Sequence, residues 1–152
     1  MSAVHRVLVV GAGSAGCTVS AFLSQAGVEV EVVEAHADVT ALGSGITVQG
    51  NALRVMKELG CWDEAEQIGF GFTETGIRGH HGALYTTLTD IQTGGPDLPA
   101  TMGMERPRMT KMLFDASVRA GTRFRMSTSF TSLVQDADGV DVTFSDGTSG
   151  RY

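Results

Sequence analysis

The stretch VLVVGAGSAG at residues 7–16 decides the fold, because an apolar strand-like run leads directly into three spaced glycines. Gly11 permits a tight turn out of the strand, and Gly13 lets backbone N–H groups approach a pyrophosphate. Gly16 lets the following helix pack closely on the sheet. The stretch therefore predicts the first strand and turn of a nucleotide-binding βαβ unit.

The residues that follow supply the rest of this unit. A helix is expected over 14–26. The free N–H groups of its first turn, including those of Ser14 and Ala15, and the positive end of the helix dipole together favour binding of an anion. A strand is expected over 28–34. It ends at Glu34, about 20 residues past the glycines, where a carboxylate accepts hydrogen bonds from an adenosine ribose. The alternative is a glycine-rich strand-to-helix turn that holds no ligand.

The second strand is less apolar than a parallel strand covered on both faces. Val30 and Val32 alternate with Glu29 and Glu31. We therefore expect that one face of this strand is less deeply buried, or that the strand lies toward an edge of the sheet.

Composition excludes several classes of protein. The chain has 152 residues and a formal net charge of −6, without a polybasic run, so neither nucleic acid nor an anionic membrane surface is an expected partner. The apolar run at residues 7–10 is too short to span a bilayer, and no secretory signal pattern is present. These features predict a cytoplasmic protein. Cys17 and Cys61 are expected to be reduced packing residues.

The remaining chain predicts alternating helices and short strands. Helices are expected over 51–59, 62–68 and 108–120, and strands at Ile77, 83–89, 122–126, 130–135 and 140–145. Asp138-Gly139 and Asp146-Gly147 are hairpin turns, so the chain is expected to finish as an antiparallel meander. Residues 36–50 form a segment too long for an ordinary βα connection and are expected to be a functional or disordered loop.

With these residues located, the chain resembles the N-terminal part of an FAD-dependent monooxygenase of the para-hydroxybenzoate hydroxylase type. The resemblance covers essentially all 152 residues. Beyond the glycines, it rests on Gly43-Ser44-Gly45-Ile46 leading into Asn51-Ala52-Leu53, on Glu105-Arg106, and on the meander. It implies an α/β fold: a Rossmann-like FAD-binding domain over 1–152, with a parallel sheet, an antiparallel meander and the start of a substrate domain in strands within 74–104.

The resemblance also assigns residues to the flavin. It places Gly45, Ile46, Thr47 and Val48 beside the isoalloxazine ring. It implies that Arg106 contacts the ribityl-phosphate region, a role that suits a planar guanidinium. The alternative for Arg106 is a solvated charge at a helix entry.

One further position and one departure complete the assignment. Phe130 occupies the place of a residue near the adenine, although core packing is an equal alternative. Gly50 stands where the family usually has proline, so the loop leaving the flavin is expected to be less rigid.

The implied activity is that of a monooxygenase. Such an enzyme uses FAD, NADH or NADPH and dioxygen to insert one oxygen atom into a small organic, in particular an aromatic, substrate. The alternatives are an FAD-dependent reductase or dehydrogenase of the same fold, and a non-catalytic nucleotide-binding module. The later flavin motifs of the family do not occur in these residues. We therefore expect the chain to be the N-terminal portion of a longer protein and to be inactive alone, and no catalytic residue is assigned.

Three other signals are given structural interpretations. Adjacent His80 and His81 would point to opposite faces of a strand, and no partner has ligand spacing, so no metal site is expected. His5 and His36 flank strands and are interpreted as surface residues. The four methionines at positions 102, 104, 109 and 112 are expected to fill a core.

Overall fold

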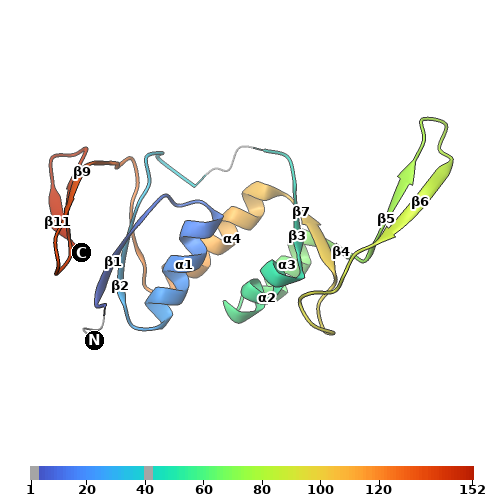
Figure 1. Cartoon of the computed structure of the whole chain (residues 1–152), viewed down its shortest axis with the longest axis horizontal. Coiled ribbons are helices and arrows are strands. Elements are labelled where there is room, and N and C mark those ends of the chain that lie inside the picture. Colours follow the sequence, from blue (N-terminus) through green and yellow to red (C-terminus); the bar gives the residue numbers. More distant parts are fainter. Residues whose placement is uncertain (1–3, 40–42) are drawn as a thin grey trace. The chain divides into compact units, whose positions relative to one another are not determined.

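The computed structural model describes residues 4–39 and 43–152, which belong to two compact units. The first unit comprises Met1–Ala41 and Leu113–Tyr152, and the second comprises Leu42–Met112. Each unit is described by itself below (Figure 1).

The first unit is built on a parallel sheet whose strand order is β1-β2-β8. Its strands are β1 (Arg6–Val10), β2 (Glu29–Val33) and β8 (Arg123–Arg125), and α1 (Ser14–Gln25) connects β1 to β2. Val7 pairs with Val30, and Val32 pairs with Phe124. The βαβ unit predicted from the glycines and from the two apolar runs is therefore confirmed.

The position of β2 corrects one alternative drawn from its charges. β2 lies between β1 and β8 and is the central strand of this sheet, so the expectation of an edge position is wrong. Val30 and Val32 are fully buried, and Glu31 is buried as well, at 7% exposure. The glutamates of β2 have specific hydrogen-bond and ion-pair partners, on the face of the sheet opposite to α1.

The predicted antiparallel meander covers this face of the sheet. It consists of β9 (Phe130–Gln135), β10 (Val140–Phe144) and β11 (Ser149–Arg151), in the order β11-β10-β9. Val142 and Phe144 pack against Val33, and Leu8 and Tyr152 extend the same apolar cluster. The meander therefore buries the face of the sheet that α1 does not cover.

Glu31 ties the sheet to the meander through charged and polar contacts. Its carboxylate accepts hydrogen bonds from Arg6 (3.2 Å), Arg125 (3.1 Å) and the Tyr152 hydroxyl (2.8 Å). Burial acts to raise the pKa of Glu31, but the bonds from Tyr152, Arg125 and Arg6 outweigh it and hold that pKa below its ordinary value. The Arg6 guanidinium also lies 4.6 Å from the centre of the Tyr152 ring.

On the opposite face, α1 packs beside the later half of α4 (Arg106–Arg119), as Figure 1 shows. Their contact is polar and buried: the Ser20 and Ser117 hydroxyls share a hydrogen bond of 2.7 Å, and Ser117 donates to Thr122 at 2.9 Å. Small hydroxyl side chains with paired donors and acceptors let two helices approach closely without leaving a buried polar group unsatisfied.

The second unit contains a sheet that the sequence analysis did not predict. Its strands are β3 (Ile46–Gln49), β7 (Thr101–Met104) and β4 (Gly69–Phe72), in the antiparallel order β3-β7-β4. β3 lies in the segment that was expected to be a loop, and that part of the expectation is wrong. The helices α2 (Gly50–Glu58) and α3 (Trp62–Ile68) were predicted to within a residue.

Methionines fill much of the core of this unit and of the adjoining helix. Met102, Met104, Met109 and Met112 are all buried, so the predicted core role of the four methionines is confirmed. Flexible thioether side chains fit the irregular space between a short sheet and its helices.

Two glycines of the second unit come into backbone contact. A Cβ on Gly50 would lie 2.3 Å from the Gly94 nitrogen, and a Cβ on Gly94 would lie 2.6 Å from the Gly50 oxygen. The Gly50 N–H group also donates to the Ala100 carbonyl at 3.0 Å. The loop after β6 therefore passes directly over the first residue of α2.

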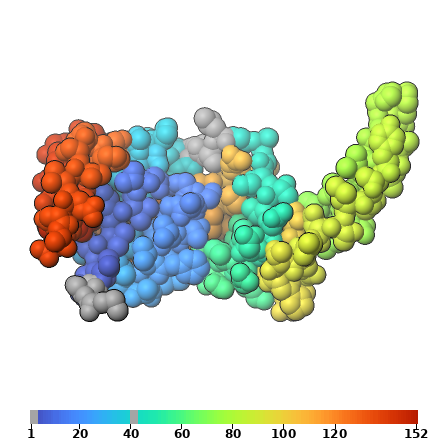
Figure 2. Space-filling view, viewed as in Figure 1, coloured from blue at the N-terminus to red at the C-terminus, as the bar shows by residue number. Residues whose placement is uncertain are grey.

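A two-stranded hairpin formed by β5 (Glu74–Arg78) and β6 (Leu84–Thr89) extends from this unit, as the yellow-green segment of Figure 2 shows. Every residue of both strands is exposed, including Ile77, Leu84, Tyr85 and Leu88. Both strands were predicted. A hairpin with apolar side chains on open surface is only marginally stable by itself.

The Glu31 cluster yields a prediction about stability. Glu31→Gln removes the charge that Arg6 and Arg125 share, and we expect the free energy of unfolding to fall by about 1–3 kcal/mol. Because the folded-state pKa of Glu31 is lowered, its stabilisation is complete above the ordinary value of 4.5 and is lost as the pH falls through the folded-state pKa.

Urea unfolding at pH 7 and at pH 3 measures both effects. The matched control is Glu29→Gln on the same strand, where the side chain is 52% exposed and its ion pairs are worth less than about 1 kcal/mol. Equal losses of stability in the two variants at pH 7 would contradict the prediction.

Candidate functional site

The turn between β1 and α1 depends on a close approach of two glycines. Gly11 has φ +97°, a conformation that favours glycine, and its N–H group donates to the Val33 carbonyl at 2.8 Å. A Cβ on Gly16 would lie 1.9 Å from the Gly11 oxygen. The roles predicted for these two glycines, a tight turn and close helix packing, agree with this geometry.

Gly13 has a different environment. It is the N-cap of α1, and no described atom lies within 4 Å of the position that its Cβ would take. Within the described chain, α1 has neither a side-chain cap bond nor an acidic residue in its first turn. The N–H groups at the start of the helix, including those of Ser14 and Ala15, therefore face open space, which suits an anion.

Glu34 follows β2 and reaches back to this turn. Its Oε2 accepts a hydrogen bond from the Ala12 N–H group at 2.8 Å, and its side chain is only 14% exposed. Burial acts to raise the pKa of Glu34, but the hydrogen bonds from His36 and Ala12 outweigh it and lower that pKa. A charged carboxylate is thus fixed beside the helix N-terminus.

His36 is part of this site, a contact that the sequence analysis missed. Its N–H group and its ring Nδ1 lie 2.9 Å and 2.6 Å from Oε1 of Glu34. The ring is 86% exposed, so the predicted surface position is confirmed, but the bond to Glu34 was not foreseen. The two-residue spacing is the only feature of the sequence that could have suggested it.

The turn after β8 holds the backbone around Glu34 and His36. Ser127 donates to the His36 carbonyl at 2.9 Å, and Thr128 donates to the Glu34 carbonyl at 2.8 Å. Phe130 follows two residues later, at the start of β9, with a 42% exposed side chain. It is therefore not a core residue of the described unit.

The second unit brings together the residues predicted to lie at the flavin ring. Ile46 pairs with Met104, two residues before Arg106, and the Arg106 side chain lies 3.6 Å from the position of a Gly43 Cβ. Gly45 is exposed, whereas Val48 is buried. Arg106 is exposed, and its guanidinium has no hydrogen bond or ion pair to any described residue.

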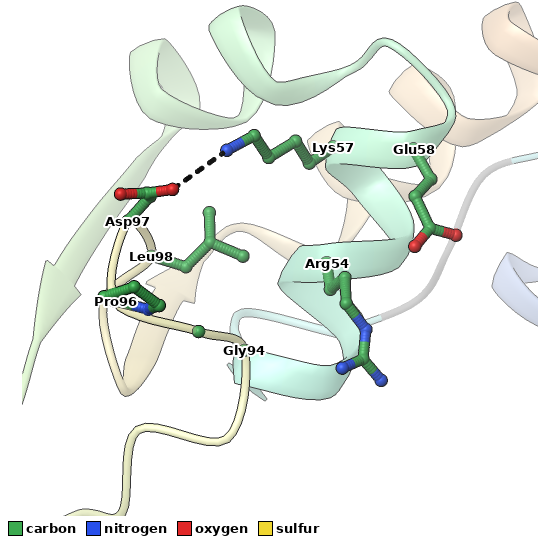
Figure 3. Close-up of a pocket in the computed structure, with 8 residues that line it drawn as sticks. Arg54, Lys57, Glu58, Gly94, Pro96, Asp97 and Leu98 are labelled. Atoms are coloured by element: carbon green, nitrogen blue, oxygen red, sulfur yellow. Dashed lines mark ion pairs between the residues drawn. The ribbon is translucent and has the colours of Figure 1, made fainter.

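A separate shallow pocket lies between α2 and the loop at residues 94–98 (Figure 3). Arg54 and Glu58 lie on the helix, and Lys57 reaches Asp97 at 4.0 Å. Two cations and two anions line this pocket, so it has no net charge to select a ligand. None of the predicted site residues belongs to it.

Cys17 lies on α1 one residue after Gly16, and its thiol is held in the neutral form. Its thiol is fully buried and donates to the Ala12 carbonyl at 3.2 Å. Burial first, and the Glu34 charge second, raise the pKa of Cys17 to about 11, so the thiol stays neutral. The described part of the chain contains no group of three His, Cys, Asp or Glu side chains arranged to hold a metal ion.

The class of protein follows from this geometry together with the sequence of the whole chain. Residues 5–152 match the family described as "FAD binding domain", and the chain belongs to that family. The open cradle at Gly13, the free start of α1 and the Glu34 carboxylate fit the pyrophosphate and ribose of FAD. None of the helices in the described ranges has the length and apolar character needed to cross a bilayer.

Two curated relatives carry FAD in their names. An FAD-dependent urate hydroxylase of Klebsiella pneumoniae subsp. pneumoniae is 28% identical over 149 residues, which are 95% of this chain and 37% of the relative. The FAD-dependent monooxygenase pynG of Aspergillus niger is 29% identical over 150 residues, 93% of this chain and 33% of that protein. The chain thus spans about a third of the length of these relatives.

Solved structures show the same fold. The p-nitrophenol 4-monooxygenase PnpA from Pseudomonas putida superposes with a TM-score of 0.85 at 19% identity, over 99% of this chain and 40% of that one. The tetrameric form of 2-methyl-3-hydroxypyridine-5-carboxylic acid oxygenase gives a TM-score of 0.81 at 24% identity, over 99% and 38%. At these identities, the likeness establishes the α/β fold.

Alanine substitutions at Gly16 and at Gly13 are expected to change the stability of the protein by different amounts. Gly16→Ala places a methyl group against the Gly11 carbonyl, and we expect it to lower the free energy of unfolding by about 3 kcal/mol. Gly13→Ala enters open space and is expected to change stability by less than about 1 kcal/mol. Urea unfolding of both variants measures the difference, and a Gly16→Ala protein as stable as the wild type would contradict the geometry.

Proposed function

We propose that the first unit binds the ADP half of FAD on the turn between β1 and α1. The observation that carries this proposal is the open space at Gly13, beside a helix N-terminus and a fixed carboxylate. In this arrangement, the N–H groups of Ser14 and Ala15 neutralise the pyrophosphate, and Glu34 accepts hydrogen bonds from the ribose. Phe130 packs beside the adenine, a role supported by its exposed side chain.

The second unit supplies the protein surface around the flavin ring in this proposal. The exposed backbone at Gly45 and the adjoining residues Ile46 and Val48 form one wall. Arg106 donates to the ribityl-phosphate region, and its guanidinium is free to do so because no described group engages it. These roles are the ones that the resemblance implies for each residue, and mutation of each residue tests them.

The activity proposed for the complete protein is that of an FAD-dependent monooxygenase acting on a small organic, in particular an aromatic, substrate. FAD bound at these residues would supply the redox chemistry, with NADH or NADPH as electron donor and dioxygen as the oxygen source. The residues of this chain bind and orient the cofactor and exclude water from it. We assign no acid or base to them.

The substrate platform is proposed to include strands within residues 74–104. The support for it is the exposure of the β5–β6 hairpin, whose apolar side chains Ile77, Leu84 and Leu88 lie on open surface. Such side chains suit a surface that other parts of a longer protein cover.

The nucleotide cradle predicts the effect of a side chain at Gly13. Gly13→Val should abolish FAD binding, because the added methyl groups occupy the space of the pyrophosphate. Flavin fluorescence measures binding, and circular dichroism shows that the variant is folded. FAD occupancy equal to that of the wild type would contradict the assignment.

The ribose contact predicts a smaller loss. Glu34→Ala should weaken FAD binding by about 1.5–3 kcal/mol, the range for a hydrogen bond to a charged group. Glu29→Ala, on the exposed start of the same strand, is the control and should leave the affinity unchanged. An unchanged dissociation constant for Glu34→Ala would show that this carboxylate serves the backbone turn alone.

The proposed activity is tested on a longer protein that contains this chain and has the length of its curated relatives. We expect a yellow protein whose flavin absorbance bleaches with NADH or NADPH without oxygen, and which releases peroxide in air when no substrate is present. Bleaching without oxygen consumption would favour an FAD-dependent reductase. A colourless protein that binds FAD neither in the purified form nor after addition would contradict the proposal.

A further inference from the structure

His36 makes contacts at the nucleotide site that the proposed function does not use. Oε1 of Glu34 accepts two hydrogen bonds from this one residue, from its backbone N–H group and from its ring Nδ1. Oε2 of Glu34 accepts one hydrogen bond, from Ala12.

The ring contact takes up one of the hydrogen-bond acceptor positions of the Glu34 carboxylate. An ionised carboxylate offers about four lone-pair positions. Described residues occupy three of them on Glu34: His36 occupies two and Ala12 occupies one. The 2′ and 3′ hydroxyls of a ribose need two acceptors, so one hydroxyl lacks a partner while the His36 ring stays in place.

We propose that the His36 ring competes with a ribose hydroxyl for Oε1 of Glu34 and thereby sets the affinity of the site for nucleotides with free 2′ and 3′ hydroxyls. The ring must turn away before both hydroxyls bind. This inference rests on the proposed function, because it takes Glu34 as the acceptor for the ribose.

The contacts around His36 allow the ring to move while the backbone stays fixed. The ring is 86% exposed, so few contacts are lost when it rotates into solvent. The backbone is held by the bond from Ser127 to the His36 carbonyl and by the bond from Thr128 to the Glu34 carbonyl. The His36 N–H group therefore stays on Oε1, and rotation of the ring frees one acceptor position.

The other polar groups around this contact have partners of their own. From α1, the Cys17 thiol stays neutral because its pKa is raised to about 11. From β8, the Arg125 carbonyl accepts from the Glu34 N–H group, while the Arg125 guanidinium is bound to Glu31 and the meander. Asp38 is the other carboxylate of this loop, and it takes part in an interaction of its own.

The test compares the nucleotide affinities of matched histidine variants at pH 7, in a protein that carries this chain and has the length of its curated relatives. The probes are FAD, followed by flavin fluorescence, and ADP and 2′-deoxy-ADP, followed by calorimetry. We expect His36→Ala to bind FAD and ADP about two to five times more tightly than the wild type, the range set by an exposed side-chain pair. The gain should vanish for 2′-deoxy-ADP, which needs one acceptor fewer.

The controls separate this proposal from the nucleotide site itself. His81→Ala, on the exposed loop of the β5–β6 hairpin, should bind all three probes as the wild type does. Unchanged or weaker binding by His36→Ala, with Glu34→Ala still impaired, would overturn the competition and leave the ribose site standing. Full affinity in Glu34→Ala, or no binding of any probe to the wild type and the variants, would overturn the ribose site as well.

Discussion

The approach of α1 to the end of β1 is the constraint on which the rest of the first unit depends. At Gly16 the helix backbone comes so close to the Gly11 carbonyl that any side chain would collide with it. This contact fixes where the helix begins, and so where its free N–H groups point. The same turn places the Ala12 N–H group within reach of Glu34, which joins the glycines and the second strand into one site.

Much of the first unit could be predicted from sequence because its signals are local. The glycine spacing and the apolar runs identified β1, α1 and β2, and the Asp-Gly turns identified the meander. The central position of β2 could not be predicted, because the partners of Glu31 come from residues 6, 125 and 152. A glutamate in a strand indicates exposure unless distant residues neutralise it, and a single sequence does not show which residues those are.

The same contrast between local sequence signals and contacts of distant residues applies to the candidate site and to the second unit. Glu34 was found because a strand-end acid at a fixed spacing has a known physical role, whereas His36 was missed because its role comes from a side-chain rotamer. The strands β4 and β7 were missed for a different reason. Their sequences, GFGF and TMGM, contain glycine and methionine, which have little intrinsic preference for strands. β4 and β7 are stabilised by pairing with each other, and β7 also pairs with β3. Such pairing between distant segments is a property of the fold.

The backbone contact between Gly50 and Gly94 limits which segments can be exchanged between related proteins. Neither position can gain a side chain unless the other segment moves, and a proline at position 50 would also lose the N–H group that bonds to Ala100. The first residue of α2 and the path of the loop at residues 90–98 therefore constrain each other. A chimera that takes one of them from a relative with proline at this position, and the other from this chain, would combine two segments that cannot occupy their native places at once.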